Sequence, residues 1–132
     1  TIYRHHDVFL FGSDDRHNTS PPNSRTGRLT LVLASELTEE AVRHAMESGH
    51  MLVGHWGETY PAIQALKIND TEASIQVRTA DDDAITWIVD GVKSHEGHTF
   101  SYASLKDAVV RFEINHKDRV FYSQPFYIGS LN

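Results

Sequence analysis

An alternation of apolar and polar residues in the second half of the chain constrains its fold more than any other feature. Ile75 and Val77 alternate with polar neighbours. Ile85, Trp87 and Val89 repeat this pattern after a short polar segment. A period of two places every second side chain on the same face of a β-strand, so that one face can be buried. Because such segments follow one another without a helical pattern between them, the sequence predicts an antiparallel β-sandwich.

Turn and breaker residues indicate where the predicted strands end. Asp90-Gly91 directly follows one strand and is typical of a hairpin turn. The last two strands are predicted at 109–114 and 119–128. Pro125 lies inside the final strand and indicates a sheet edge or a bulge there, because proline has no N–H to donate to a neighbouring strand. The alternation at 62–69 slips once.

One helix is predicted at 38–48. Thr38 is a good N-cap, and the two glutamates that follow it lie in the first turn, where the helix dipole favours acidic side chains. Leu37 and Val42 have the spacing of a hydrophobic staple. Gly49 is expected to end the helix, because glycine readily adopts the left-handed conformation of a C-terminal cap.

The first part of the chain has a different pattern from the second. A short apolar run at 8–11 predicts a buried strand. A long loop at 13–28 follows, of a length that is usually functional or disordered, and a strand is predicted at 29–34. The sequence therefore predicts an α+β chain that is mostly β, with a short α/β segment at 1–60 and an antiparallel β-sandwich at 61–132.

Composition excludes several classes of function. The chain has 132 residues, a formal net charge of −6 and no cysteine, so it has no disulfide or cysteine-ligated metal. A broad basic face for nucleic acid is not expected. No apolar run approaches the roughly 20 residues of a membrane-spanning helix, and no signal-peptide pattern is present, which favours the cytoplasm.

Asp15 and His17 form the strongest candidate for a chemical site. Side chains two positions apart point to the same side of an extended segment, so a carboxylate and an imidazole could reach one metal ion. Both groups are good ligands for zinc, manganese or iron. The alternative is an ordinary turn, in which Asp14 and its neighbours hydrogen-bond the local backbone. Two ligands also do not complete a catalytic zinc site, which takes about three from the protein.

The segment Gly12-Ser13-Asp14-Asp15-Arg16-His17 resembles the "GSDxH" sequence that ends the barrel of the PHP (polymerase and histidinol phosphatase) family. Later segments are similar to the helix and the β-rich C-terminal extension of bacterial members; they read LTEEAVRHAMESGHMLV, ITWIVDGVKSHEGHTFSY, VVRFEIN and VFYSQPFYI. The resemblance implies that residues 1–60 are the C-terminal end of a PHP-like barrel and that 61–132 form an accessory β-sandwich.

The same resemblance implies a function. Asp15 and His17 would be ligands in a cluster of divalent metal ions (Zn, Mn or Fe), which activates water for phosphoester hydrolysis. Arg16, Arg25 and Arg28 would then bind the substrate phosphate, since a guanidinium group suits it. The family's His-x-His pair is absent from this sequence. The remaining ligands are therefore expected from a barrel N-terminal to Thr1 or from a partner chain, and this chain alone is expected to be inactive.

A second hypothesis comes from a different class. The chain would be a non-catalytic β-sandwich that binds a partner, a carbohydrate or its own catalytic domain. Exposed apolar surface at 8–11 would favour the phosphoesterase hypothesis, because the barrel should pack there. The other histidines favour neither: His55 beside Trp56 could line a pocket or be structural, and His95 and His98 are not expected to be a ligand pair.

Overall fold

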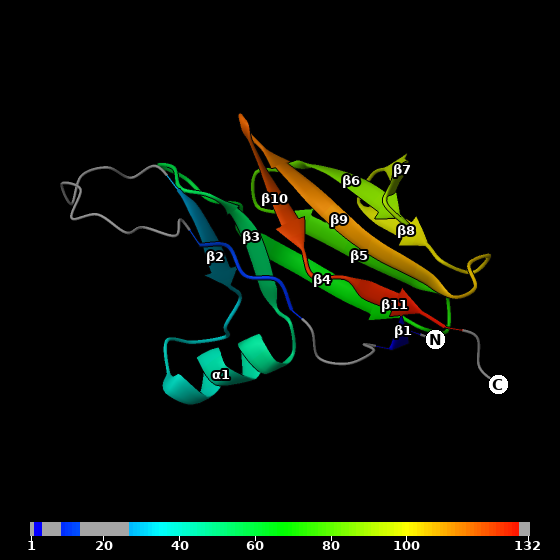
Figure 1. The fold of residues 1–132 in the computed structure, drawn as a ribbon, viewed down its shortest axis with the longest axis horizontal. Coiled ribbons are helices and arrows are strands. Elements are labelled where there is room, and N and C mark those ends of the chain that lie inside the picture. Colours follow the sequence, from blue (N-terminus) through cyan, green and yellow to red (C-terminus); the bar gives the residue numbers. More distant parts are fainter. Residues whose placement is uncertain (1, 4–8, 14–26, 130–132) are drawn as a thin grey trace.

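The computed structural model describes residues 2–3, 9–13 and 27–129, which form mostly β-strands (Figure 1). Within these ranges there is one helix, α1 (Glu39–Glu47). The strands are β1 (Ile2–Tyr3), β2 (Arg28–Val32), β3 (Met51–His55), β4 (Ile63–Asn69), β5 (Ser74–Thr79), β6 (Ala84–Val89), β7 (Val92–Glu96), β8 (Thr99–Ser101), β9 (Ala108–His116), β10 (Arg119–Ser123) and β11 (Phe126–Ile128). This is the α+β, mostly β class that the sequence predicts.

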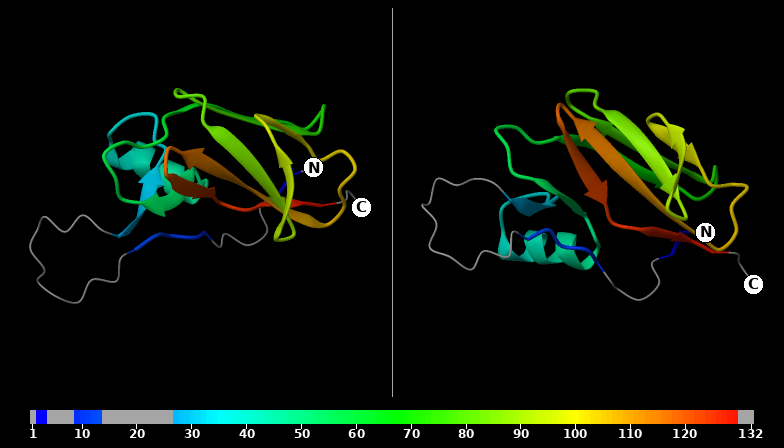
Figure 2. Two further views of the ribbon diagram at one scale, coloured as in Figure 1. Left: turned by 90° about the horizontal axis from the view of Figure 1, so that it is seen from above. Right: turned by 45° about the horizontal axis from the view of Figure 1, so that its top comes forward.

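The described strands form two antiparallel sheets. The larger has eight strands in the path β1-β11-β9-β10-β3-β2, with β6 on the other edge of β9 and β7 beside β6. The smaller has three strands in the order β4-β5-β8. Figure 2 shows β4 and β5 as a second layer beside the large sheet. The predicted antiparallel sandwich is therefore confirmed.

Aromatic side chains join the two layers. The indole of Trp87, on the large sheet, stacks on Phe100 of the small sheet at a centroid distance of 5.1 Å. Phe112 packs against the same indole edge-on at 5.4 Å. Ile75 and Val77 face this cluster from β5, and both are fully buried. The apolar positions of the sequence alternation therefore make the core.

Strand β9 is the central strand of the large sheet. Its buried residues alternate with partly exposed ones along its whole length. His116, the last residue of the strand, occupies an inward position of this alternation, two residues after Ile114. An imidazole therefore lies at a core-facing position, with 0% of its surface exposed.

The strand predicted at 119–128 is interrupted. β10 ends at Ser123 and β11 begins at Phe126, so two short strands share one edge of β9. Gln124 and Pro125 lie at the break, where the missing N–H of proline makes pairing unfavourable. The Ser123 hydroxyl accepts a 2.8 Å hydrogen bond from the Phe112 N–H and so replaces a backbone acceptor there.

Two other local predictions are confirmed. Asp90 and Gly91 have φ angles of 47° and 82° and connect β6 to β7 as a tight hairpin. The slip in the alternation of β4 coincides with a register shift between Ile63 and Ala65. The resulting bulge explains why this strand lacks a regular pattern.

The helix has the predicted ends but lacks the predicted staple. The Thr38 hydroxyl accepts a 3.2 Å hydrogen bond from the Ala41 N–H, and Gly49 has a φ of 69°. Leu37 is 99% exposed, so it cannot pack against Val42, and the staple prediction is wrong.

The strand predicted at 8–11 is also wrong for the residues that the structure describes. Residues 9–13 form no strand, and Leu10 and Phe11 are 56% and 57% exposed. The physical reason is that side chains of the sheet, instead of a neighbouring strand, bind the backbone of this segment. The division of the chain near residue 60 stays a prediction; β3, before that point, pairs with β10, after it.

Candidate functional site

The predicted metal ligands Asp15 and His17 lie outside the described residues, as do Arg16 and Arg25. Arg28 is the first residue of β2, where it is exposed and pairs in register with His55. What the structure does show is how the peptide leading to the predicted ligands is held.

Two side chains attach this peptide to the large sheet. The Gln124 carboxamide accepts a 2.7 Å hydrogen bond from the Leu10 N–H and donates a 2.8 Å bond to the Leu10 carbonyl. The Thr30 hydroxyl accepts a 2.8 Å bond from the Gly12 N–H. Gln124 is 2% exposed, so its amide is fixed in the interior. Both backbone polar groups of Leu10 are therefore satisfied without a neighbouring strand.

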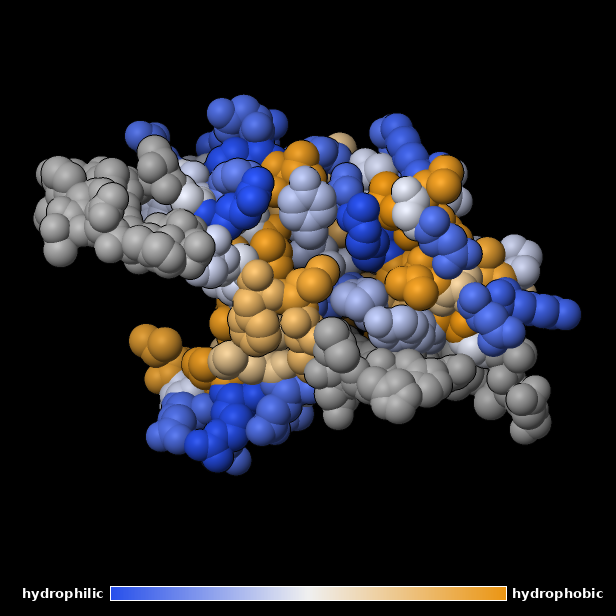
Figure 3. All heavy atoms as spheres, in the orientation of Figure 1, coloured by the Kyte–Doolittle hydropathy of each residue, from blue (hydrophilic) through white to orange (hydrophobic). Residues whose placement is uncertain are grey.

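Gly12 lies where no other residue fits. A Cβ atom at this position would be 2.5 Å from the Leu29 carbonyl oxygen and 2.9 Å from Cγ1 of Val53. These distances are far shorter than ordinary van der Waals contact, so the absence of a side chain allows the close approach to β2 and β3. Figure 3 shows apolar side chains gathered on this face of the molecule, above the helix.

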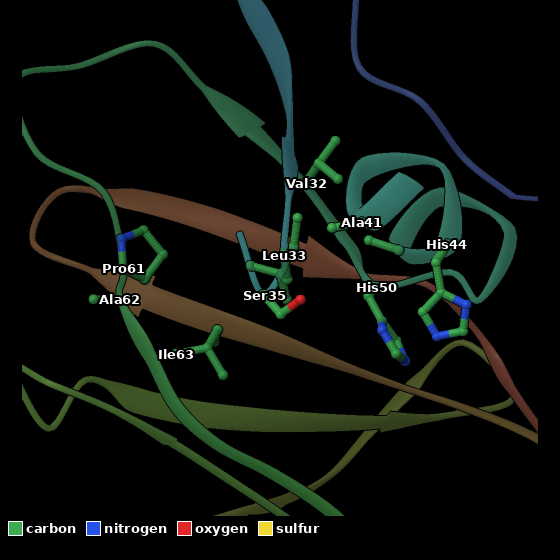
Figure 4. Close-up of a pocket in the computed structure, with 11 residues that line it drawn as sticks. Val32, Leu33, Ser35, Ala41, His44, His50, Pro61, Ala62 and Ile63 are labelled. Atoms are coloured by element: carbon green, nitrogen blue, oxygen red, sulfur yellow. The ribbon is translucent and has the colours of Figure 1, made fainter. Parts of the chain in front are cut away.

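A groove separates α1 from the start of β4 (Figure 4). Its volume is about 660 Å³, and its walls are mostly apolar. His44 and His50 lie on one side, with their rings edge-to-face at 6.3 Å, and Ile63 lies on the other. A smaller hollow of about 280 Å³ shares Leu33, His50 and Ile63 with it. The shape suits an apolar ligand or segment with a polar group near the imidazoles.

A second constellation surrounds the buried His116. Its Nδ1 lies 3.0 Å from each carboxylate oxygen of Asp83 and 4.0 Å from a carboxylate oxygen of Asp81. Its Nε2 lies 3.1 Å from the hydroxyl of Thr59. Thr79 donates a 2.6 Å hydrogen bond to Asp83 and accepts one of 2.9 Å from its N–H. Because a carboxylate accepts and does not donate, the neutral imidazole carries its proton on Nδ1 and accepts from Thr59.

The order hydroxyl, imidazole, carboxylate is the order of a hydrolase relay. Thr59 also borders a hollow of about 310 Å³ at the β9–β10 turn. However, the neighbouring Gly57 N–H donates to the Tyr60 hydroxyl, and Arg119 donates to the carbonyl of Thr59 itself. These groups are engaged inside the protein, so they do not form an oxyanion hole. The arrangement is better suited to holding an ion or fixing the turn.

Neither Asp83 nor His116 is among the candidate site residues that the sequence predicts. The sequence does contain one sign of this site: His116 continues the inward-facing positions of Phe112 and Ile114. A histidine at an inward position needs a buried polar partner. The partner Asp83 is 33 residues away in sequence and comes close only through the β6–β9 pairing.

Comparisons with protein-family models, curated proteins and solved structures find no match to this chain. In the part of the chain that the structure describes, the one helix, α1, lacks the length and apolar character needed to cross a membrane.

Proposed function

We propose that this chain is the sandwich-bearing part of a metal-dependent phosphoesterase similar to the PHP family. In this proposal Asp15 and His17 are metal ligands, and a barrel in the same protein or in a partner chain supplies the others. The bound metal would activate a water molecule for attack on a phosphoester. Arg16, Arg25 and Arg28 would hold the substrate phosphate through their guanidinium groups.

The attachment of residues 10–12 to the sheet is the observation that carries the proposal. A metal ligand works best when the backbone that precedes it is held by packing and hydrogen bonds. Here Gln124 and Thr30 bind the backbone of Leu10 and Gly12, which lie five and three residues before Asp15, the first predicted ligand. An ordinary surface turn would not need a buried glutamine that binds both polar groups of one of its residues.

The exposed side chains of Leu10 and Phe11 add support. They lie side by side in sequence, and each is more than half exposed although its neighbours are fixed. Adjacent exposed apolar residues favour a contact with another protein surface. The barrel of the proposed enzyme would supply that surface.

The proposal is tested on the protein made from the complete reading frame that encodes this chain. Metal content is measured by mass spectrometry, and hydrolysis of p-nitrophenyl phosphate is measured for the wild type, Asp15→Ala and His17→Ala. We expect each variant to lose metal and to lose at least about 100-fold in kcat/KM. Asp14→Ala is the matched control and should retain both.

Unchanged metal content and activity in both variants would refute the proposal. A complete reading frame without further clustered histidines and carboxylates would exclude a barrel in the same protein and would leave only a partner chain to complete the site, because two ligands are too few.

The groove beside α1 favours a second candidate function, a binding module for an apolar ligand. Its volume of about 660 Å³ is within the usual range for small-molecule sites. Binding of a hydrophobic fluorescent probe to the chain would be abolished by Ala62→Trp, which fills the groove. Equal binding of the probe by the wild type and this variant would exclude the groove as the binding site.

A further inference from the structure

We propose that Asp81, Asp83 and His116 form a structural site for a divalent metal ion, separate from the predicted Asp15–His17 pair. One donor atom from each of the three residues lies within 4.8 Å of the other two. Ligand atoms around a tetrahedral ion at a bond length of about 2.1 Å are about 3.4 Å apart. The His116 Nδ1 distances of 3.0 Å to Asp83 and 4.0 Å to Asp81 lie on either side of that value.

The surrounding hydrogen bonds fit such a site. A metal-bound histidine donates its other ring N–H to a nearby acceptor, and a metal-bound carboxylate is itself hydrogen-bonded. The Thr59 hydroxyl, 3.1 Å from Nε2, can be that acceptor. Thr79 donates to Oδ2 of Asp83, so Oδ1, which faces Nδ1 of His116 at 3.0 Å, would be the oxygen that binds the ion. The hydrogen-bond partners of the metal-bound imidazole and carboxylate, Thr59 and Thr79, are therefore already in place.

Proton placement changes in a defined way when the ion binds. In the ion-free chain the imidazole carries its proton on Nδ1, which faces Asp83. With an ion bound, Nδ1 would give its lone pair to the ion, and Nε2 would carry the ring N–H and donate a hydrogen bond to the Thr59 hydroxyl.

Burial and charge also favour an ion. Asp83 and His116 are almost completely buried, with side-chain exposures of 7% and 0%, whereas Asp81 is 65% exposed. An ion can therefore enter from the side of Asp81 and be held by two fixed ligands. Three consecutive aspartates crowd this turn, and the carboxylate of Asp82 pairs away from the cluster, with His98 at 2.9 Å. A dication would offset the repulsion between the other two carboxylates.

The donor set and its place in the fold indicate the metal and its role. One imidazole nitrogen, two carboxylate oxygens and a water suit Zn²⁺, in tetrahedral geometry. Residues 80–83 connect β5 of the small sheet to β6 of the large sheet, and His116 ends β9. The ion would thus fasten the crossover between the two sheets to the central strand.

The test uses the 132-residue chain carrying Asp15→Ala and His17→Ala, so that the other predicted site cannot bind metal. Zn²⁺ is titrated by isothermal calorimetry, and the melting temperature is followed with Zn²⁺ and with EDTA. We expect one equivalent of Zn²⁺ to bind and the melting temperature to rise, with EDTA reversing the rise. Nitrogen NMR should show the proton of His116 on Nε2 only when Zn²⁺ is bound.

Asp81→Ala is the discriminating variant, because its exposed side chain can be removed without disturbing the core. It should weaken Zn²⁺ binding by at least about 10-fold, the low end of what even a supporting residue contributes. Asp82→Ala is the control on the adjacent residue and should bind Zn²⁺ as the parent does. Absence of Zn²⁺ uptake by the parent, or equal affinities in these two variants, would overturn the proposal. Neither result depends on the phosphoesterase proposal, because Asp15 and His17 are already removed.

Discussion

The imidazole of His116 and the carboxylate of Asp83 meet in the interior of the sandwich, with Nδ1 3.0 Å from both carboxylate oxygens. His116 is the last residue of β9, and Asp83 directly precedes β6. The antiparallel pairing of these strands, in which Asn115 is in register with Ala84, brings the two residues together. The register of the central strand pair therefore places two polar residues at one buried point, and this contact has measurable consequences for stability.

Removing Asp83 should be strongly destabilising in metal-free buffer. Asp83→Ala leaves His116 and Thr79 buried without their shared partner, at a cost of about 3 kcal/mol in the free energy of unfolding. Urea denaturation followed by tryptophan fluorescence measures this change. Asp81→Ala removes an exposed carboxylate from the same turn and should change stability by less than about 0.5 kcal/mol. Similar changes in the free energy of unfolding for the two variants would show that the buried Asp83–His116 pair does not stabilise the fold.

Trp87 should be the most sensitive apolar position of the core. Trp87→Ala removes a fully buried ring that contacts Phe100 and Phe112, and a loss of about 4 kcal/mol in stability is expected. Calorimetric melting measures the loss. Val92→Ala, at a site that is 68% exposed in the neighbouring hairpin strand, is the control and should melt near the wild-type temperature.

Gly12→Ala should release the peptide from the sheet. The new Cβ would lie 2.5 Å from the Leu29 carbonyl oxygen. We expect this clash to destabilise the attached peptide by about 1–3 kcal/mol, so that residues 9–13 detach from the sheet. Hydrogen exchange at the Leu10 amide should then become faster, because its bond to Gln124 is lost. Leu10→Ala retains the backbone bonds and should exchange as slowly as the wild type. Slow exchange in the glycine variant would contradict the close-approach argument.

Stability should fall at alkaline pH because of Tyr102. Burial and the 2.6 Å hydrogen bond to Asp70 raise the pKa of Tyr102 to about 12. The unfolded chain loses the tyrosine proton near pH 10 while the folded chain keeps it, so the folded state binds more protons between pH 10 and 12. The contribution is complete below pH 10 and is lost as the pH rises through 12.

Urea midpoints measured from pH 8 to pH 11.5 test this dependence. Tyr102→Phe should lower stability by about 1 kcal/mol at pH 8, through the lost hydrogen bond, and should flatten the alkaline fall. Tyr122→Phe, at a partly exposed position, is the matched control and should retain the wild-type slope. An unchanged slope in Tyr102→Phe would rule out this tyrosine as the cause.

Most of the fold follows from local sequence patterns. The two-residue period of β5, β6 and β9 and the Asp90-Gly91 turn predict strands and a hairpin because they depend on neighbouring residues alone. Thr38 and Gly49 predict the ends of the helix for the same reason. The apolar run at 8–11 misleads because its pattern says nothing of the partner, which is a side chain 114 positions away.

The sites were less predictable than the fold. Asp15 and His17 are recognisable because they are close in sequence, and they stay a prediction. The cluster around His116 required knowledge of the pairing between β6 and β9, which brings Asp83 to a histidine 33 positions later. Contacts of this kind depend on strand register, and no spacing in the sequence records that register.

The hydrogen bonds between Gln124 and Leu10 join residues that are 114 positions apart. During synthesis on the ribosome, residues 10–12 are made well before Gln124, so the two hydrogen bonds of the Leu10 backbone can form only after residue 124 has been added. Premature termination anywhere before residue 124 would leave this peptide without its amide partner. A product truncated there would lack both hydrogen bonds to the Leu10 backbone and would retain only the bond between Thr30 and Gly12 in front of the predicted ligands.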